Sequence, residues 1–125
     1  MENIKRILVA EDDEINQEVI KILLEGEDFV VEVVSNGKEV LAALARNDYQ
    51  LILMDVQMPQ LDGYEATKMI RQKEQEENRS PIPIIAVTAY ATEEDRNKLY
   101  SAGVSDYLSK PLHMDQLMDS VRNFL

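Results

Sequence analysis

The chain has 125 residues, the length of one domain that can bury a continuous apolar core. It has no cysteine, which excludes disulfides, thiolate metal ligands and thiol nucleophiles, and no apolar run approaches the roughly 20 residues of a membrane span. A formal net charge of -11 opposes nucleic-acid binding, which requires a basic surface, and suits a cation or a partner with a basic face.

Short apolar runs alternate with amphipathic stretches in the first part of the chain. In chain order we expect a strand over residues 7–10, a helix over 14–25, a strand over 29–34, a helix capped by Asn36, and a strand over 51–54 that ends at Asp55. Gly26 is placed to end the first helix, and Asp13 is interpreted as its cap. The apolar residues of that helix that fall at helical spacing are Ile15, Val19, Ile22 and Leu23.

The alternation continues to the end of the chain. We expect a helix opening at Asp62-Gly63, a polar helix end and loop over 72–80, a strand over 84–87 ending at Thr88, a helix from a capping box at 92–95 to Gly103, a strand over 106–109, and a last helix with an inner face of Leu117, Val121 and Leu125. Five strands alternating with five helices predict an α/β fold in which helices cover both faces of a doubly wound parallel sheet.

Polar residues follow the carboxyl ends of four predicted strands: Glu11 and Asp12 the first, Asp55 the third, Thr88 the fourth and Lys110 the fifth. These ends meet at one edge, where open α/β sheets bind their ligands. Three carboxylates there oppose one another's ionisation, and a hard cation such as Mg²⁺, Mn²⁺ or Ca²⁺ removes the conflict. A cation, an ammonium and a hydroxyl would suit a phosphoryl group carried by an aspartate.

Five ordered stretches resemble the receiver family of response regulators: residues 7–13, 54–59, 62–63, 86–89 and 107–111. The resemblance extends from residue 7 to residue 125, and it implies a flavodoxin-like (βα)5 sheet with strand order 2-1-3-4-5. It implies a single receiver domain over residues 1–125 that acts as the phosphoacceptor switch of a two-component system or phosphorelay. Such a domain is not an enzyme, since it catalyses only the phosphorylation and dephosphorylation of its own aspartate.

The resemblance also assigns the metal ligands. Asp55 would be the phosphoacceptor and Asp12 would bind Mg²⁺, or Mn²⁺ in its place, directly. Glu11 would bind the ion through a water molecule, and Gln57 would supply its backbone carbonyl. Glu11 stands where the family most often has aspartate, and its longer side chain still reaches the ion through water.

The remaining site residues surround the phosphoryl group in the same resemblance. Thr88 would bond one phosphoryl oxygen, and Lys110, held by a cis peptide before Pro111, would neutralise another. Thr88 and Tyr107 would form a switch pair, in which the hydroxyl moves toward the phosphate and the ring turns into the vacated space. We hypothesise that Gln57 and Tyr90, which flank the site, set the lifetime of the phosphorylated state.

The partners implied are a histidine kinase or a histidine phosphotransfer domain, and a downstream protein target. Asn16, together with Glu11-Asp12, Met58-Pro59 and residues 62–67, is most similar to receivers attached to hybrid sensor kinases. We expect a cytoplasmic domain that contacts neither nucleic acid nor membrane. Ile15, Pro111 and Leu112 are candidates for an apolar docking patch, with a core position as the equal alternative for Ile15.

Other functions fit the sequence less well. A phosphohydrolase of the haloacid dehalogenase kind has a second aspartate two residues after its nucleophile, where this chain has Gln57. A flavodoxin-like binding module would have a Ser/Thr/Gly-rich loop after the first strand, where residues 11–13 are acidic. No Walker sequence is present. A receiver that binds partners without phosphorylation is a third alternative, opposed by the presence of every residue that the chemistry requires.

Overall fold

The computed structural model describes residues 4–125, and in them strands and helices alternate strictly along the chain. The elements are β1 (Arg6–Ala10), α1 (Glu14–Glu25), β2 (Val30–Val34), α2 (Gly37–Arg46), β3 (Leu51–Asp55), α3 (Gly63–Glu76), β4 (Ile84–Thr88), α4 (Glu93–Ala102), β5 (Asp106–Ser109) and α5 (Met114–Phe124). All strand pairs are parallel, in the order β2-β1-β3-β4-β5. The predicted fold class and strand order are confirmed.

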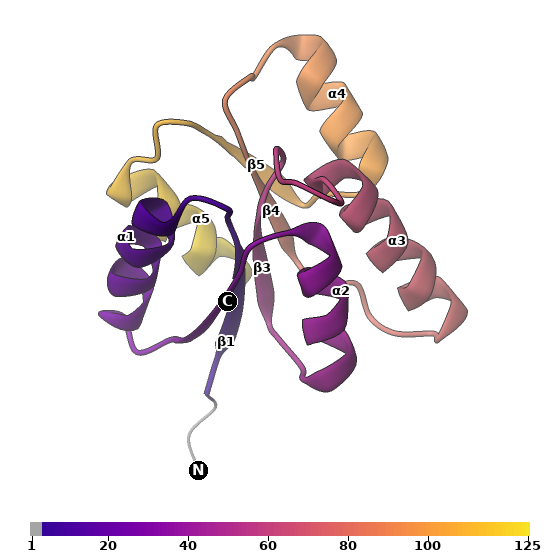
Figure 1. Cartoon of the computed structure of the whole chain (residues 1–125), viewed down its shortest axis with the longest axis horizontal. Coiled ribbons are helices and arrows are strands. Elements are labelled where there is room, and N and C mark those ends of the chain that lie inside the picture. The colour runs from indigo at the N-terminus through magenta and orange to yellow at the C-terminus, as the bar shows by residue number, and fades with distance from the viewer. Residues whose placement is uncertain (1–3) are drawn as a thin grey trace.

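Helices cover both faces of the sheet, with α1 and α5 on one face and α2, α3 and α4 on the other (Figure 1). Ile20 and Leu24 of α1 pack with Leu117 and Val121 of α5 in one core cluster. The second cluster lies beneath the other three helices. Strands β3 and β4 are buried at every residue, because both of their faces are covered.

Side chains cap the helices where the sequence predicts. Asp13 accepts hydrogen bonds from two backbone N–H groups of α1, and Asn36 and Asp62 each accept one from the helix that follows. At α4 the Thr92 hydroxyl accepts from Asp95 N at 3.1 Å and donates to the Asp95 carboxylate at 2.7 Å. The usual capping box has the longer glutamate, which reaches back to the backbone N–H of the cap residue.

The four apolar residues predicted at helical spacing do lie in α1, but three of them face solvent. Ile15, Val19 and Ile22 are 76%, 51% and 65% exposed, while Leu23 is half-buried against the core. The helix has a second set of apolar residues, Ile20 and Leu24, and these are the ones that the sheet buries. Hydrophobic spacing alone does not distinguish two apolar faces of the same helix. No helix within residues 4–125 is long and apolar enough to cross a bilayer.

Candidate functional site

The three predicted acids come together at the carboxyl edge of the sheet. Strands β1 and β3 are neighbours, with Ala10 opposite Met54, so the residues that follow them are also adjacent. Glu11, Asp12 and Asp55 each place a carboxylate oxygen within 4.8 Å of the others. Glu11 and Asp55 are buried, whereas Asp12 is exposed. Of the three acids, Asp12 is therefore the one that solvent reaches freely.

Lys110 brings the counter-charge from the end of β5. Its Nζ lies 2.8 Å from Asp55 Oδ2 and 3.9 Å from Glu11 Oε1. The backbone N–H of Lys110 donates to the Thr88 carbonyl at 2.7 Å, and the bond to Pro111 is cis, as the resemblance implied. Burial lowers the pKa of Lys110, but the hydrogen bond and charge of Asp55, together with the charges of Glu11 and Asp12, outweigh it and raise that pKa above its ordinary value.

One ammonium does not balance the three acids. Burial, followed by the hydrogen bond and the charge of Asp55, raises the pKa of Glu11 from 4.5 to about 7, although Lys110 acts in the opposite direction. The site therefore disfavours full ionisation of its carboxylates. A hard divalent cation fits this donor set, which is made only of oxygens and has one exposed acid to meet a hydrated ion.

The loop after β3 fixes the orientation of the Asp55 carboxylate. The backbone N–H of Gln57 donates to Asp55 Oδ1 at 3.1 Å, so the two carboxylate oxygens have different partners. Val56 N donates to the Val87 carbonyl at 3.0 Å, and Gly63 N donates to the Val56 carbonyl at 2.9 Å. These bonds tie the loop to β4 and to the start of α3. The side chain of Gln57 is exposed.

Thr88 ends β4 beside this loop, since Val87 pairs with Asp55. Its side chain is buried, and its hydroxyl donates to the Tyr90 carbonyl at 2.9 Å and accepts from Tyr90 N at 3.1 Å. The hydroxyl is thus engaged within its own loop. The Tyr90 side chain is 59% exposed.

Tyr107 lies on the same face of the sheet as Thr88. Tyr107 pairs with Ala86, two residues before Thr88, and successive side chains of a strand alternate between faces. The ring is half-buried, its hydroxyl is 3.4 Å from Arg96 Nη1, and it meets the Tyr100 ring edge-on with centroids 6.2 Å apart. Sequence reasoning missed Arg96 and Tyr100. Their spacing of four residues on α4 was the available signal.

The candidate docking residues are close in sequence to the site: Ile15 follows Asp12 by three residues, and Pro111 and Leu112 follow Lys110 directly. Ile15 is exposed, which removes the core alternative, and Pro111 is also exposed. Leu112 is half-buried and packs against the core beneath α1 and α5. Ile15 continues into Val19 and Ile22, and these three residues are here called the α1 stripe.

The fold and the site together define a doubly wound α/β domain with an acidic pocket at the carboxyl edge of its sheet. The chain belongs to the response regulator receiver domain family, whose model matches residues 7–122. It is therefore a receiver domain of the kind that acts in two-component and phosphorelay signalling, and the predicted family is confirmed.

The similar proteins are of two kinds: large kinases, of which this chain matches a small part, and small regulators, which it matches over almost their whole length. The chain is 40% identical over 116 residues to the sensor histidine kinase GacS of Pseudomonas protegens, covering 93% of this chain and 13% of that protein. It is 33% identical to the polar-differentiation response regulator DivK of Brucella ovis, covering 97% of this chain and 96% of that protein. The chain spans between 6% and 13% of the length of the first four curated relatives.

Two solved structures are informative about receiver chemistry. The receiver domain of sensor histidine kinase PA1611 from Pseudomonas aeruginosa has a magnesium ion coordinated in its active-site cleft. This structure matches the chain with a TM-score of 0.85 and 37% identity, and the match covers 98% of both chains. The receiver domain of Ssk1 from Saccharomyces cerevisiae was co-crystallised with the histidine phosphotransfer protein Ypd1; this match has a TM-score of 0.93 and 30% identity, and it covers 97% of this chain and 88% of that chain.

Proposed function

We propose that this receiver accepts a phosphoryl group on Asp55 in a Mg²⁺-dependent reaction, and that residues 1–125 act in it as one domain. The contact between Lys110 Nζ and Asp55 Oδ2 at 2.8 Å, inside a cluster with Glu11 and Asp12, carries the proposal. An aspartate that needed only a salt bridge would not require two further acids beside it. The presence of these two acids is explained if the pocket holds a cation together with a phosphoryl group.

The proposed ion ligands are Asp12 and Asp55 directly, Glu11 through water, and the backbone carbonyl of Gln57. Bound Mg²⁺, or Mn²⁺ in its place, would neutralise charge on the carboxylates and on the transferring phosphoryl group. In the PA1611 receiver, a magnesium ion occupies the active-site cleft. The same class of ion suits the oxygen-only donor set of this chain.

The transfer is an in-line displacement at phosphorus. An Asp55 carboxylate oxygen forms a bond to phosphorus as the bond between phosphorus and the donor imidazole nitrogen breaks. The imidazole takes the electron pair of that bond, and it leaves as a neutral group when its other ring nitrogen already carries a proton. A small donor such as acetyl phosphate would instead release acetate. Lys110, already beside Asp55, would then contact a phosphoryl oxygen, and Thr88 would donate to another.

The phosphoryl group would shift the conformation by competing for the Thr88 hydroxyl. To reach the phosphate, that hydroxyl gives up its bond to the Tyr90 carbonyl, and the Tyr107 ring turns into the space it leaves. Tyr107 then loses its contacts with Arg96 and Tyr100 of α4. The equilibrium between these two conformations shifts only to the extent that the phosphoryl group stabilises the one in which the Tyr107 ring has turned. A changed surface on α4, β5 and α5 would alter affinity for a downstream protein.

Intact mass spectrometry after incubation with acetyl phosphate and Mg²⁺ tests the proposal. We expect the mass of one phosphoryl group to be added to the chain, and we expect the addition to disappear when EDTA replaces Mg²⁺. A chain that gains the same mass in EDTA would contradict the metal dependence. A chain that gains none under either condition would contradict the function.

Gln57 and Tyr90 are expected to set how long phospho-Asp55 survives, because their exposed side chains flank the pocket through which a water must approach. Gln57→Ala and Tyr90→Ala should change the rate of phosphoryl loss, measured by intact mass over time after the donor is removed. Thr92→Ser, which keeps the α4 cap, is the control and should decay at the wild-type rate. An unchanged rate of phosphoryl loss in both alanine variants would show that Gln57 and Tyr90 do not set the lifetime of phospho-Asp55.

We also propose that a histidine phosphotransfer domain docks on the apolar patch of Ile15, Pro111 and Leu112, so that Ile15 is the one residue of the α1 stripe that contacts this partner. Ile15 lies in the first turn of α1, three residues after Asp12, and offers exposed apolar surface for such a contact. Ile15→Asp should slow transfer from a phosphorylated phosphotransfer protein roughly tenfold, the effect of losing an interface residue worth over 1 kcal/mol, while phosphorylation by acetyl phosphate stays normal. Ile22→Asp, two turns further away, is the matched control. Equal transfer rates in wild type and Ile15→Asp would exclude Ile15 from the interface.

A further inference from the structure

A cavity of about 310 Å³ opens at the end of the molecule opposite the acidic pocket. Tyr49 precedes β3 and Ile82 precedes β4, so the cavity borders the amino ends of the strands, whereas the acids follow their carboxyl ends. The five residues of β3 separate the two places by roughly 15 Å. The phosphoryl chemistry described above uses none of the residues that line the cavity.

The cavity has an apolar part, to which α2, α3 and the segments before β3 and β4 contribute, and a polar part formed by charged and amide side chains. Tyr49 and Ile70 are buried, Leu41, Leu44 and Ile82 are half-buried, and Met69 is 46% exposed at the opening. The volume lies at the lower end of the range for small-molecule sites, which are mostly apolar with a few placed polar groups. A ligand with a short apolar body would fit these walls.

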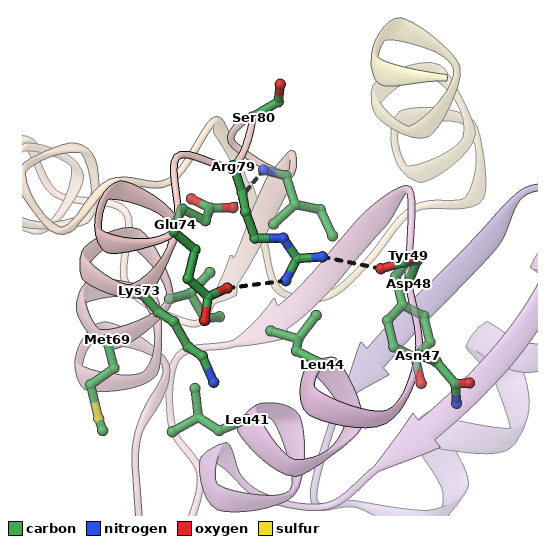
Figure 2. Close-up of a pocket in the computed structure, with 13 residues that line it drawn as sticks. Leu41, Leu44, Asn47, Asp48, Tyr49, Met69, Lys73, Glu74, Arg79 and Ser80 are labelled. Atoms are coloured by element: carbon green, nitrogen blue, oxygen red, sulfur yellow. Dashed lines mark hydrogen bonds and ion pairs between the residues drawn. The ribbon is translucent and has the colours of Figure 1, made fainter.

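The acids at the rim already have partners. Arg79 crosses the opening and pairs with Asp48 at 3.1 Å and with Glu77 at 3.6 Å (Figure 2). Glu74 pairs with Arg71 at 2.8 Å and accepts a hydrogen bond from Ile82 N at 2.8 Å. Each of the three acids therefore already has an arginine as its partner.

Lys73 differs from its neighbours, because its ammonium forms no ion pair with any residue in 4–125. Figure 2 shows its side chain reaching toward the side of the cavity formed by Leu41 and Leu44. We infer that the cavity binds a small apolar carboxylate, with the hydrocarbon against these walls and the carboxylate at Lys73. The net charge of -11 opposes an anion at long range, but salt screens that repulsion beyond about 8 Å, whereas contact with Lys73 is closer.

Three ligands with the same six-carbon chain test the charge preference: hexanoate, hexanamide and hexylamine. In methyl NMR titrations of the full chain, hexanoate should shift the signals of Leu41, Leu44 and Ile82 at the lowest concentration, and hexylamine at the highest. Absence of shifts with hexanoate at millimolar concentrations overturns the proposal. So does binding of hexylamine as tight as that of hexanoate.

Lysine variants test the polar anchor. Lys73→Gln should weaken hexanoate roughly two- to fivefold, the range for an exposed ion pair, and leave hexanamide binding unchanged. Lys68→Gln is the matched control on the same helix, because Lys68 pairs with Glu65 and does not line the cavity. Both lysines are exposed, so neither substitution threatens the fold. Equal hexanoate affinity in wild type and Lys73→Gln also overturns the proposal.

Discussion

Asp55→Asn should abolish phosphoryl uptake from acetyl phosphate and from a phosphohistidine donor. The substitution keeps the shape of the side chain but replaces the nucleophilic carboxylate with an amide. It also removes one of the three charges that would hold the cation. Intact mass spectrometry should show the unmodified chain at donor concentrations that fully modify the wild type, which makes this the largest effect expected of any substitution in the site.

Asp13→Asn is the matched control for this loss. Asp13 is a neighbouring acid whose side chain caps α1 and is not a member of the cluster. Asparagine caps a helix about as well as aspartate, so stability and phosphorylation should remain near the wild-type values. Phosphorylation of Asp55→Asn at an undiminished level would show that another residue accepts the phosphoryl group. Equal losses in both variants would point to a general electrostatic effect rather than to a nucleophile.

The sequence predicts the fold well because its signals are local and consistent. Apolar runs at β3 and β4 are buried at every position, and Asn36, Asp62 and Gly103 stand where a helix begins or ends. Gly103 adopts φ 113°, the left-handed conformation that glycine enters without strain. Each of these features depends on a few adjacent residues, so the pattern can be interpreted before any tertiary contact is known.

The candidate site is predictable for a different reason. Parallel strands place their carboxyl ends at one edge, and this brings Glu11, Asp12, Asp55 and Lys110 together without further information. What the sequence does not predict depends on contacts between distant segments. Examples are the two contacts from α4 to Tyr107 and the solvent-facing side of α1, which is decided by what α5 and β2 leave uncovered.

The cavity beyond α2 and α3 shows the same limit. Its walls come from two separate stretches of the chain, residues 41–49 and 69–82, and no spacing along the chain predicts that Arg79 pairs with Asp48 across 31 residues. Helical periodicity predicts which residues of α2 lie on one face. It does not predict whether a neighbouring helix packs closely enough to fill the space beside them.

Gly63→Ala should destabilise the domain and weaken phosphorylation together. A Cβ at this position would lie 2.5 Å from the backbone oxygen of Asp55 and 2.9 Å from Val56 Cα. Both are backbone atoms, so relief requires α3 to move away from the loop that carries the phosphoacceptor. Alanine favours a helix by up to about 1 kcal/mol over glycine, but overpacking of a tight contact costs roughly 1–3 kcal/mol or more. We therefore expect a net loss of stability in urea unfolding.

Gly26→Ala is the opposite case and serves as the control. Gly26 has φ -63° and ψ -18°, and a Cβ there would lie no closer than 3.4 Å to the nearby carbonyl oxygens of Ile22 and Leu23. Alanine at such a position stabilises by about 0.4–1 kcal/mol, because it restricts the unfolded chain. The two substitutions should thus shift the urea midpoint in opposite directions at equal slope, and only Gly63→Ala should slow modification of Asp55. A Gly63→Ala chain as stable and as readily phosphorylated as the wild type would mean that the approach of α3 does not hold the phosphoacceptor loop in place.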